Sequence, residues 1–409
     1  MSKNLIKFIA LFIIIVTLIF VFHNYHSVYN IDHLAYAVAL GLDVGENNKI
    51  KLSFQLSIPG GESGNSGSSQ SDSTVVNSVE CSTINSGINL LNTYISKEVN
   101  LSHCKVIVFS EKFAYQGLGD SIYTLMNNVQ IRPDCNIIIS KCNAEYFLNT
   151  SKPVLEKLSA RYYEVAPSSS DYSGYTEDIT LSEFFSDLND TTSQCYGILG
   201  GVNTSSTHSI DDNSTPIQKD TNIKADDTLI TSKPNIENMG LAIFKNDKLV
   251  GELTGFETVC HQIITNNLNS CSISIHSPFE ENKIITLRVN LKDKTKNSVE
   301  LTDNGPYISS KISLEARVLS ASEASNYLSA ENVKELEKYI NSYMKEQISS
   351  YLYKISKEYN SDIDGFGRYA TKNFLTWNDW INYNWLENFN SAFFNVEVDT
   401  TIKSSYILS

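Results

Sequence analysis

Hydrophobic and polar residues alternate in several short segments, and this period of two indicates half-buried β-strands. The clearest alternation places one set of apolar residues on a single side: Ile50, Leu52, Phe54, Leu56 and Ile58. Residues 35–42 precede this segment across a polar turn at residues 45–48, so the two segments predict a hairpin. Further strands are predicted at residues 285–291, 312–318 and 394–402. A second hairpin is predicted from residues 241–244 and 249–253.

Other segments repeat their apolar residues at helical spacing. One such stripe runs from Ile84 to Val99, and a longer one runs from Val333 to Tyr359 with Ser329 as its predicted N-cap. Thr180 and Glu183 predict a capping box at the start of another helix. Residues 105–109 and 135–139 are predicted strands on either side of a helical stretch at residues 122–126. That order is typical of a βαβ crossover and of a mixed α/β layer.

Two polar stretches divide the chain. Residues 59–74 are rich in glycine and serine and predict a flexible loop. Residues 200–236 are mostly polar and predict a flexible linker. We therefore expect an α+β protein with three mixed α/β domains behind a single N-terminal transmembrane helix. The predicted segments are an anchor at 1–26, an N-terminal α/β domain at 31–199, a small hairpin and helix domain at 237–276, and a C-terminal α+β domain at 279–409.

An apolar run from Phe8 to Phe22 follows Lys3 and Lys7. Its fifteen residues would span about 22 Å as a helix, and Leu5 and Ile6 bring it closer to the ~30 Å of a bilayer core. A cleaved signal peptide, a lipoprotein signal and a retained anchor all remain open. A retained anchor is favoured, because no small-residue cleavage motif follows and the first cysteine is Cys81. The leading lysines would keep the N-terminus inside and place the rest of the chain outside the cytoplasm.

The charge balance narrows the classes of function. The chain has 32 Lys and Arg residues against 46 Asp and Glu residues, a formal charge of −14. This balance argues against nucleic-acid binding, which needs a cationic surface to displace phosphate counterions.

The seven cysteines form an odd set without a compact framework. They indicate buried thiols or a non-oxidising exterior, and one or two disulfides remain open.

Candidate catalytic and metal motifs are incomplete. Residues Ser102, His103 and Lys105 belong to a Ser-x-x-Lys spacing found in penicillin-recognising enzymes, but no matching partner elements follow, and the segment runs into a strand. A metal site could be imagined from Cys260, His261, Cys271 and His276, whose spacing does not favour shared coordination. Buried thiols and surface imidazoles are the simpler interpretation. We expect no enzyme activity, no catalytic residue, no cofactor and no metal.

The C-terminal part contains all of the tryptophan, at Trp377, Trp380 and Trp385. Trp377, Ile381, Trp385 and Phe389 recur every fourth residue, which predicts a core face of one helix. Trp380 lies off that row and is a candidate for a partner surface.

Residues 362–367 predict a structural corner at the end of the long helix. Gly365 and Gly367 indicate a positive φ or close packing. Phe366 is expected to enter the core, and Asp362 is expected to cap the next turn.

Four blocks together resemble the GerAC/GerBC-type spore germination proteins, the C subunits of nutrient-germinant receptors. The blocks are residues 31–43; residues 101–111 continuing to 117–118 and 131–133; residues 242–251; and Asp362-Ile363-Asp364-Gly365-Phe366-Gly367 followed by Trp377, Trp385 and Phe389. They occur in family order over almost the whole of the chain beyond the apolar run.

The resemblance implies a three-domain α+β protein on the outer face of the spore inner membrane, without a known catalytic residue. It also implies a transporter-like B subunit and a membrane A subunit as partners. One departure is the missing lipid-bearing cysteine after the apolar run, which a transmembrane anchor would replace. An extracytoplasmic solute-binding protein for a nutrient is the main alternative. A solute-binding protein would have two similar lobes, whereas the predicted regions of this chain are unequal and dissimilar. A cell-wall hydrolase or penicillin-binding enzyme is disfavoured because the partner motifs of the Ser-x-x-Lys spacing are missing.

Overall fold

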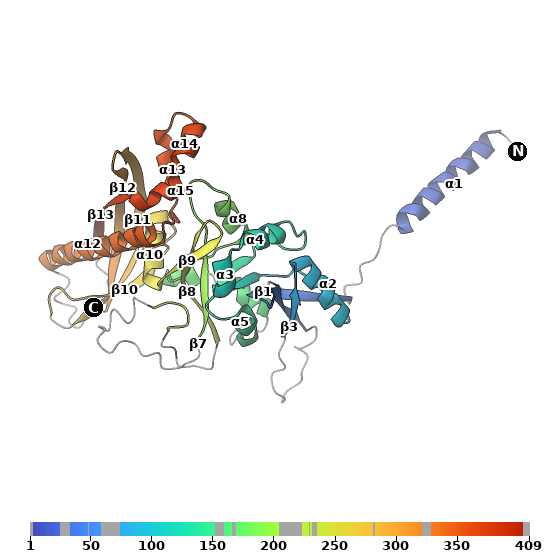
Figure 1. Ribbon diagram of the computed structural model, residues 1–409, viewed down its shortest axis with the longest axis horizontal. Coiled ribbons are helices and arrows are strands. Elements are labelled where there is room, and N and C mark those ends of the chain that lie inside the picture. Colours follow the sequence, from blue (N-terminus) through green and yellow to red (C-terminus); the bar gives the residue numbers. More distant parts are fainter. Residues whose placement is uncertain are drawn as a thin grey trace.

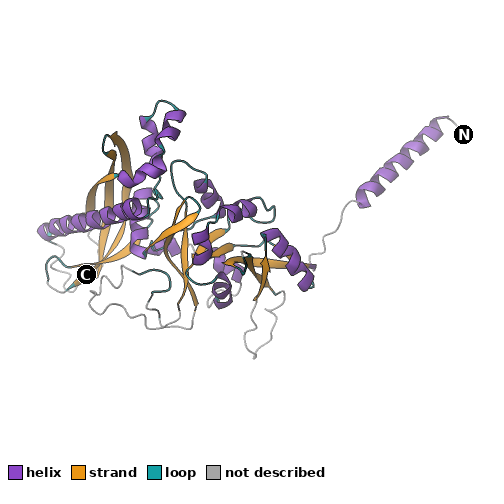
Figure 2. Cartoon of the chain, viewed as in Figure 1, coloured by secondary structure: helices purple, strands orange, loops and turns teal. Residues whose placement is uncertain are grey.

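The structure is a computed structural model that describes residues 3–24, 33–47, 49–58, 74–151, 159–165, 169–203, 223–228, 230, 235–280, 283–320 and 329–403. Figures 1 and 2 show a mixed α/β protein organised by two β-sheets. One sheet has nine strands and the other has four.

The nine-stranded sheet has the order β3-β2-β1-β5-β6-β7-β8-β9, and β4 also pairs with β1. Its strands are β1 (Leu34–Val44), β2 (Ile50–Ser57), β3 (Thr74–Cys81), β4 (Glu98–Asn100), β5 (Val106–Ser110), β6 (Asn136–Ser140), β7 (Tyr196–Asn203), β8 (Asn235–Lys245) and β9 (Lys248–Leu253). β1, β5, β6 and β7 are parallel neighbours, and the two ends of the sheet are antiparallel. Every residue of β5 and β6 is buried, as expected for parallel strands that are covered on both faces.

Helices cover both faces of this sheet. The core on one face is formed with α2 (Ile84–Tyr94), α3 (Glu111–Gln116), α4 (Gly119–Met126) and α8 (Leu181–Leu188). The core on the other face is formed with α5 (Ala144–Thr150) and α6 (Ser159–Val165). A short helix, α7 (Ser170–Ser173), lies in the chain between α6 and α8. The predicted capping box of α8 is confirmed, because Thr180 and Glu183 each bond to the other's backbone N–H.

The four-stranded sheet has the order β10-β11-β12-β13. Its strands are β10 (Cys271–His276), β11 (Ile284–Thr302), β12 (Gly305–Ser320) and β13 (Phe393–Ile402). β13 joins β12 in parallel, whereas the other pairs are antiparallel. The helical segments of this part are α10 (Gly255–Thr265), α12 (Ala330–Tyr353), the π-helical turn η3 (Lys354–Glu358), α13 (Gly367–Ala370), η4 (Thr371–Asn373), α14 (Trp377–Tyr383), α15 (Trp385–Asn388) and η5 (Phe389–Ser391).

The long predicted helix corresponds to α12. Ser329 caps it by accepting a hydrogen bond from the Asn332 backbone N–H at 3.2 Å. Its predicted apolar stripe is buried against α10 and the second sheet at Leu336, Ile340, Met344, Ile348 and Leu352. Burial of such a stripe is the main source of stability for a helix of this kind.

β8 joins the two parts of the molecule. Ala242 and Phe244 pack into the core of the first sheet, whereas Leu241 and Ile243 pack into the core of the second. Successive side chains of a strand point to opposite faces, so one strand can serve both cores. The predicted small domain at 237–276 consequently has no sheet of its own. Its hairpin, β8 and β9, continues the first sheet, and β10 begins the second.

Three local predictions need correction. The helix from Ile84 ends at Tyr94, because Ile95 is extended, and Val99 lies in β4 beside β1. Thr74, assigned to the loop, begins β3, and the remainder of that loop, residues 59–73, is outside the described residues. The linker predicted at 200–236 overlaps β7 and β8 at its ends. Within it, Ala225 is buried and its N–H donates to the Met239 carbonyl at 2.9 Å. Residues 204–222, 229 and 231–234 are outside the described residues.

The N-terminal apolar run forms α1 (Lys3–Asn24). From Leu5 to Ile19 its described large apolar side chains are exposed, including Phe8 at 74% and Phe12 at 64%. None of the helices in the described part of the chain combines the length and apolarity that a bilayer span requires.

Candidate functional site

The predicted corner at residues 362–367 is the centre of the candidate site. The chain leaves α12 through the π-helical turn η3 and then places Asp362 in a fully buried position. Its carboxylate accepts hydrogen bonds from the Phe366 N–H (3.0 Å) and the Gly367 N–H (2.9 Å). Gly365 has a φ of +69°, and Phe366 is fully buried. The predicted cap, left-handed glycine and core aromatic are therefore all present at this corner.

Asp362 also holds a tryptophan. The Trp385 indole N–H donates to Asp362 Oδ2 at 2.7 Å. Burial raises the pKa of Asp362 to about 7, although the hydrogen bonds from Trp385 and the backbone act in the opposite direction. A buried carboxylate with three N–H donors orients the groups around it, because few other arrangements satisfy all of them.

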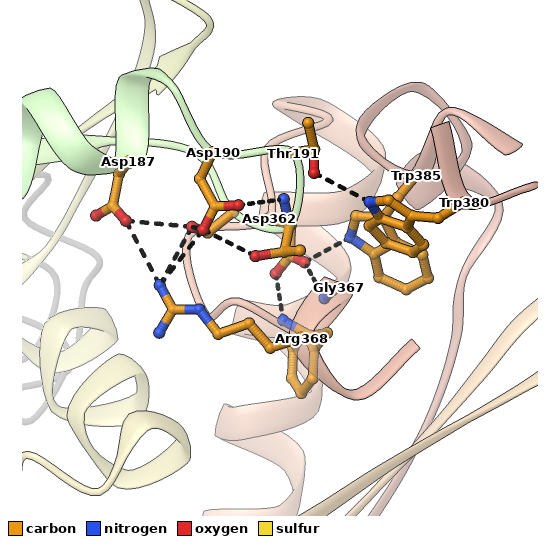
Figure 3. Close-up of polar contacts among 11 residues, drawn as sticks. Asp187, Asp190, Thr191, Asp362, Gly367, Arg368, Trp380 and Trp385 are labelled. Carbon is orange, nitrogen blue, oxygen red and sulfur yellow. Dashed lines mark hydrogen bonds and ion pairs between the residues drawn. The ribbon is translucent and has the colours of Figure 1, made fainter. Parts of the chain in front are cut away.

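The corner is in contact with the loop that follows α8. The Gln194 N–H donates to the Asp362 carbonyl at 2.9 Å, and Gly367 lies against Thr192. Nearby, Arg368 reaches Asp187 at 3.5 Å and Asp190 at 3.9 Å. Figure 3 shows Asp187 and Asp190 facing Arg368, with Asp362 beside Gly367. We call this contact the joint; its residues are Asp187, Asp190, Thr191, Thr192, Gln194, Asp362, Gly367, Arg368, Trp380 and Trp385.

The acidic side of the joint is partly shielded from water. Burial raises the pKa of Asp187 to about 6, whereas Arg368 and Ser193 act to lower it. Ser193 donates to both Asp187 and Asp190 at 3.2 Å. Arg368 is more than half exposed, so its ion pairs add little stability on their own.

Trp377 and Trp380 have the opposite roles to those predicted, whereas Trp385 and Phe389 are buried, as predicted. Trp380 is 2% exposed, and its indole N–H donates to Thr191 Oγ1 at 3.0 Å (Figure 3). It stacks on Trp385 with ring centroids 6.1 Å apart. Trp377 is 64% exposed and Ile381 is 44% exposed. The every-fourth-residue pattern failed because Asn384 has a φ of +50° and ends α14, so Trp385 does not continue the row of Trp377 and Ile381.

A second buried polar cluster, which the sequence analysis missed, surrounds His261 of α10. His261 Nδ1 lies 2.7 Å from Asp364 Oδ1 and 3.1 Å from the Tyr351 hydroxyl. Its Nε2 lies 3.3 Å from Glu177 Oε2, an ion-pair contact without hydrogen-bond alignment. His261 was expected at the surface but is fully buried. Asp364 belongs to the same corner as Asp362, so the corner reaches both the joint and this cluster.

The surroundings of His261 favour its charged form. Burial acts to lower the pKa of this imidazole, but the hydrogen bond with Asp364 and the contact with Glu177 outweigh it and raise the pKa to about 10. Glu177 comes from the segment before α8, so the cluster bridges the two parts of the chain. Asp364, the second aspartate of the corner motif, was the only sequence signal for this cluster. Glu177 and His261 belong to no motif that would have indicated their contact.

The candidate residues of the second block lie elsewhere. Ser102 and His103 occupy an exposed turn before β5, and Ser102 donates to the Asn100 side chain. Lys105 lies 3.8 Å from Glu164, and His103 packs against Tyr36 with ring centroids 4.5 Å apart. The Ser-x-x-Lys spacing is not carried on a helix, so the turn of helix that would align the amine with the hydroxyl is missing.

The cysteines and histidines do not assemble into a metal centre in the described part of the chain. All seven cysteines are free thiols, and all except Cys142 are buried. Burial raises the pKa of Cys271 to about 12 and raises that of Cys260 well above its usual value. The Cys260 and Cys271 thiols are therefore poor nucleophiles and behave as small core residues. What the joint and the His261 cluster can do is hold two sheets in one arrangement.

Comparisons with known proteins cover most of the chain. The family described as spore germination protein N-terminal domain matches residues 27–198. The family described as spore germination B3/GerAC like, C-terminal, matches residues 239–406.

Similar proteins carry related names. Spore germination protein GerQC of Bacillus cereus is 21% identical over 313 residues, which is 76% of this chain and 77% of GerQC. YfkR of Bacillus subtilis (strain 168), provisionally named a spore germination protein, is 22% identical over 384 residues and 92% of each chain. A crystal structure of the GerBC protein has a TM-score of 0.49 and 14% identity, covering 89% of this chain and 96% of that one.

Proposed function

Because this chain belongs to the Ger(x)C family, the C subunits of spore germinant receptors, we propose that it is a non-catalytic scaffold subunit of such a receptor. In this role it holds the receptor's A and B membrane subunits in a defined arrangement on the outer face of the spore inner membrane. The observation that carries the proposal is the joint, where backbone contact between Gly367 and Thr192 and the hydrogen bond from the Gln194 N–H to the Asp362 carbonyl connect the two parts of the chain.

A scaffold needs rigidity more than it needs a reactive group. The joint supplies hydrogen bonds between the two parts of the chain, and the His261 cluster supplies an ion pair between them at Glu177. These contacts would have to break before the two sheets could move apart, and a buried charge left without its partner is strongly destabilising. An enzyme or a hinged binding protein would instead need an open site or a mobile connection.

Membrane attachment through α1 is the finer part of the proposal. Its support is the run of large apolar side chains that α1 exposes, since water-exposed apolar surface of this kind is costly. In cells that lack the A and B subunits the full chain should still fractionate with membranes, and deletion of residues 3–24 should strongly reduce the membrane-bound fraction. Mass spectrometry should detect no lipid on any cysteine. A full chain recovered in the soluble fraction would remove this part of the proposal.

The scaffold role is tested by co-purification. The full chain should recover the two membrane subunits, and Gly367→Ala should reduce that recovery and slow the response to nutrient. Ser102→Ala should leave the recovery of the membrane subunits and the response to nutrient unchanged. It is the matched control, because it alters a residue of the family motif that lies outside the joint. If Ser102→Ala abolishes the response, or if a β-lactam labels Ser102 in the wild type, the non-catalytic role is wrong.

Solute binding remains the alternative, and one observation favours it. A polar cavity of about 410 Å³ lies where β1 and β5 end, lined in part by Asp43, Lys51, Ser110 and Glu145. Several of these groups are already engaged: Asp43 accepts from two backbone N–H groups, and Lys51 donates to Glu145 at 2.6 Å. Calorimetry of the full chain with nutrient, in the absence of the membrane subunits, separates the two roles. Saturable binding that Lys51→Ala abolishes would favour the alternative.

A further inference from the structure

The C-terminal part carries an exposed apolar tip. It is formed by Leu375, Trp377 and Ile381, which are 100%, 64% and 44% exposed. Trp377 and Ile381 are four residues apart on α14 and therefore share one face of that helix. Figure 1 shows α14 projecting at the outer end of this part of the molecule.

The tip is held rigidly from below. Trp380, three residues after Trp377 on α14, is buried and packs edge-on against Phe374 with ring centroids 5.5 Å apart. It also bonds to Thr191 and stacks on Trp385. Thr376 caps α14 by accepting from the Asp379 N–H at 3.2 Å. Because α14 is anchored and capped in this way, the fold itself holds Trp377 in its exposed position.

The size and composition of the tip favour a lipid surface over a protein partner. A stable protein interface buries roughly 800 Å² per partner and involves about 20–30 residues, and three exposed side chains supply only a small part of that. Insertion at a bilayer interface needs only a few apolar side chains, and tryptophan is enriched at that depth. The neighbours Asn378 and Asn382 are exposed and polar, as expected for a short helix lying at the surface.

We propose that Leu375, Trp377 and Ile381 insert into the boundary between headgroups and acyl chains of a bilayer, as a second membrane contact besides α1. This inference rests on the proposed function in one respect: attachment through α1 is what brings the tip close to a bilayer. The net charge of −14 offers no general attraction to anionic lipid. Insertion should therefore occur on zwitterionic phosphatidylcholine and should be insensitive to salt, because it is apolar.

The experiment uses the full chain reconstituted into phosphatidylcholine vesicles that contain lipids brominated near the headgroup or deep in the acyl chain. Flotation reports attachment of the chain, and quenching of tryptophan fluorescence reports the tip. We expect quenching, stronger with the shallow bromines, that disappears in Trp377→Phe because Trp380 and Trp385 are buried. Leu375→Ser combined with Ile381→Ser should weaken it at least several-fold without lowering the melting temperature. Val129→Ser, at a fully exposed apolar residue elsewhere, is the matched control and should have no effect.

The outcomes separate the two proposals. A chain that floats with the vesicles but shows no Trp377-dependent quenching retains its anchor and refutes tip insertion. A chain that does not float and is not quenched contradicts both. Quenching that persists in Trp377→Phe also refutes the tip. A Trp377 fluorescence emission that shifts to the blue only when the membrane subunits are added would refute it as well, because the tip would then contact a membrane subunit and not lipid.

Discussion

Gly367 and Thr192 are in backbone contact across the joint. A β-carbon on Gly367 would lie 2.4 Å from the Thr192 carbonyl oxygen and 2.7 Å from its α-carbon. Both neighbours are backbone atoms and cannot turn aside as a flexible side chain would. Glycine is therefore required here by close approach of two chain segments, and not by its φ.

Gly367→Ala should destabilise the protein by about 1–3 kcal/mol, the usual cost of overpacking a well-packed site. The measurement is chemical denaturation of the full chain in detergent micelles, read by near-UV circular dichroism. Asn378→Ala, an exposed change on α14, is the control and should stay close to the wild type. If both variants unfold at the same denaturant concentration, the segments are not in the contact described.

Gly365 poses a different requirement, because its φ of +69° is unfavourable for a residue with a β-carbon. The nearest atoms to an added β-carbon are those of the Arg368 side chain, at 3.4 Å or more, so space is not limiting. Gly365→Val should cost about 1–2 kcal/mol from backbone strain alone. Gly365→Asn should cost less, since asparagine tolerates this region better. Equal losses in the two variants would argue against strain as the cause.

Trp380 and Trp377 should differ sharply in their effect on stability. Trp380→Ala removes a buried ring and its hydrogen bond to Thr191, at an expected cost of about 3–5 kcal/mol. Trp377→Ala alters an exposed side chain and should stay within about 0.5 kcal/mol of the wild type. Thermal melts of the two variants provide the comparison. A larger loss for Trp377→Ala would support a continuous helical row of Trp377, Ile381 and Trp385 after all.

His261 should make stability depend on pH. Its pKa is raised from 6.5 to about 10 in the folded protein, so its stabilising contribution is complete below pH 6.5 and is lost as the pH rises toward 10. His261→Gln should lower stability by about 3–5 kcal/mol at pH 6.5, because Glu177 and Asp364 lose their buried partner. The difference between the two proteins should then shrink by pH 10. Denaturation across this range measures it, and a difference that stays constant would mean that His261 is not charged.

Much of the fold follows from local patterns. The alternation at Leu52, Phe54 and Leu56, the capping box at Thr180 and the stripe along α12 all specify their elements through neighbours within a few residues. The corner was also predictable, because Asp362, Gly365 and Phe366 act on residues close to them in sequence.

The joint and the His261 cluster could not be predicted in the same way. Trp380 meets Thr191, and Asp364 meets His261, across more than a hundred residues of sequence. No period or motif encodes such a meeting. The error over the tryptophans has a local cause, since a single left-handed residue at Asn384 changes the phase of the helix. Fourfold spacing predicts a shared face only while the helix is unbroken.

The pairing of β7 with β8 decides how this protein can be dissected. The two family matches end at residue 198 and begin at residue 239, so a cut between them would leave β7 on one fragment and β8 on the other. The N-terminal fragment would then present a naked, apolar edge strand, which is a template for aggregation. The C-terminal fragment would lose the partner that keeps Leu241 and Ile243 in place. Expression of either half alone should therefore yield insoluble material, and a soluble shorter form should retain β1 through β13.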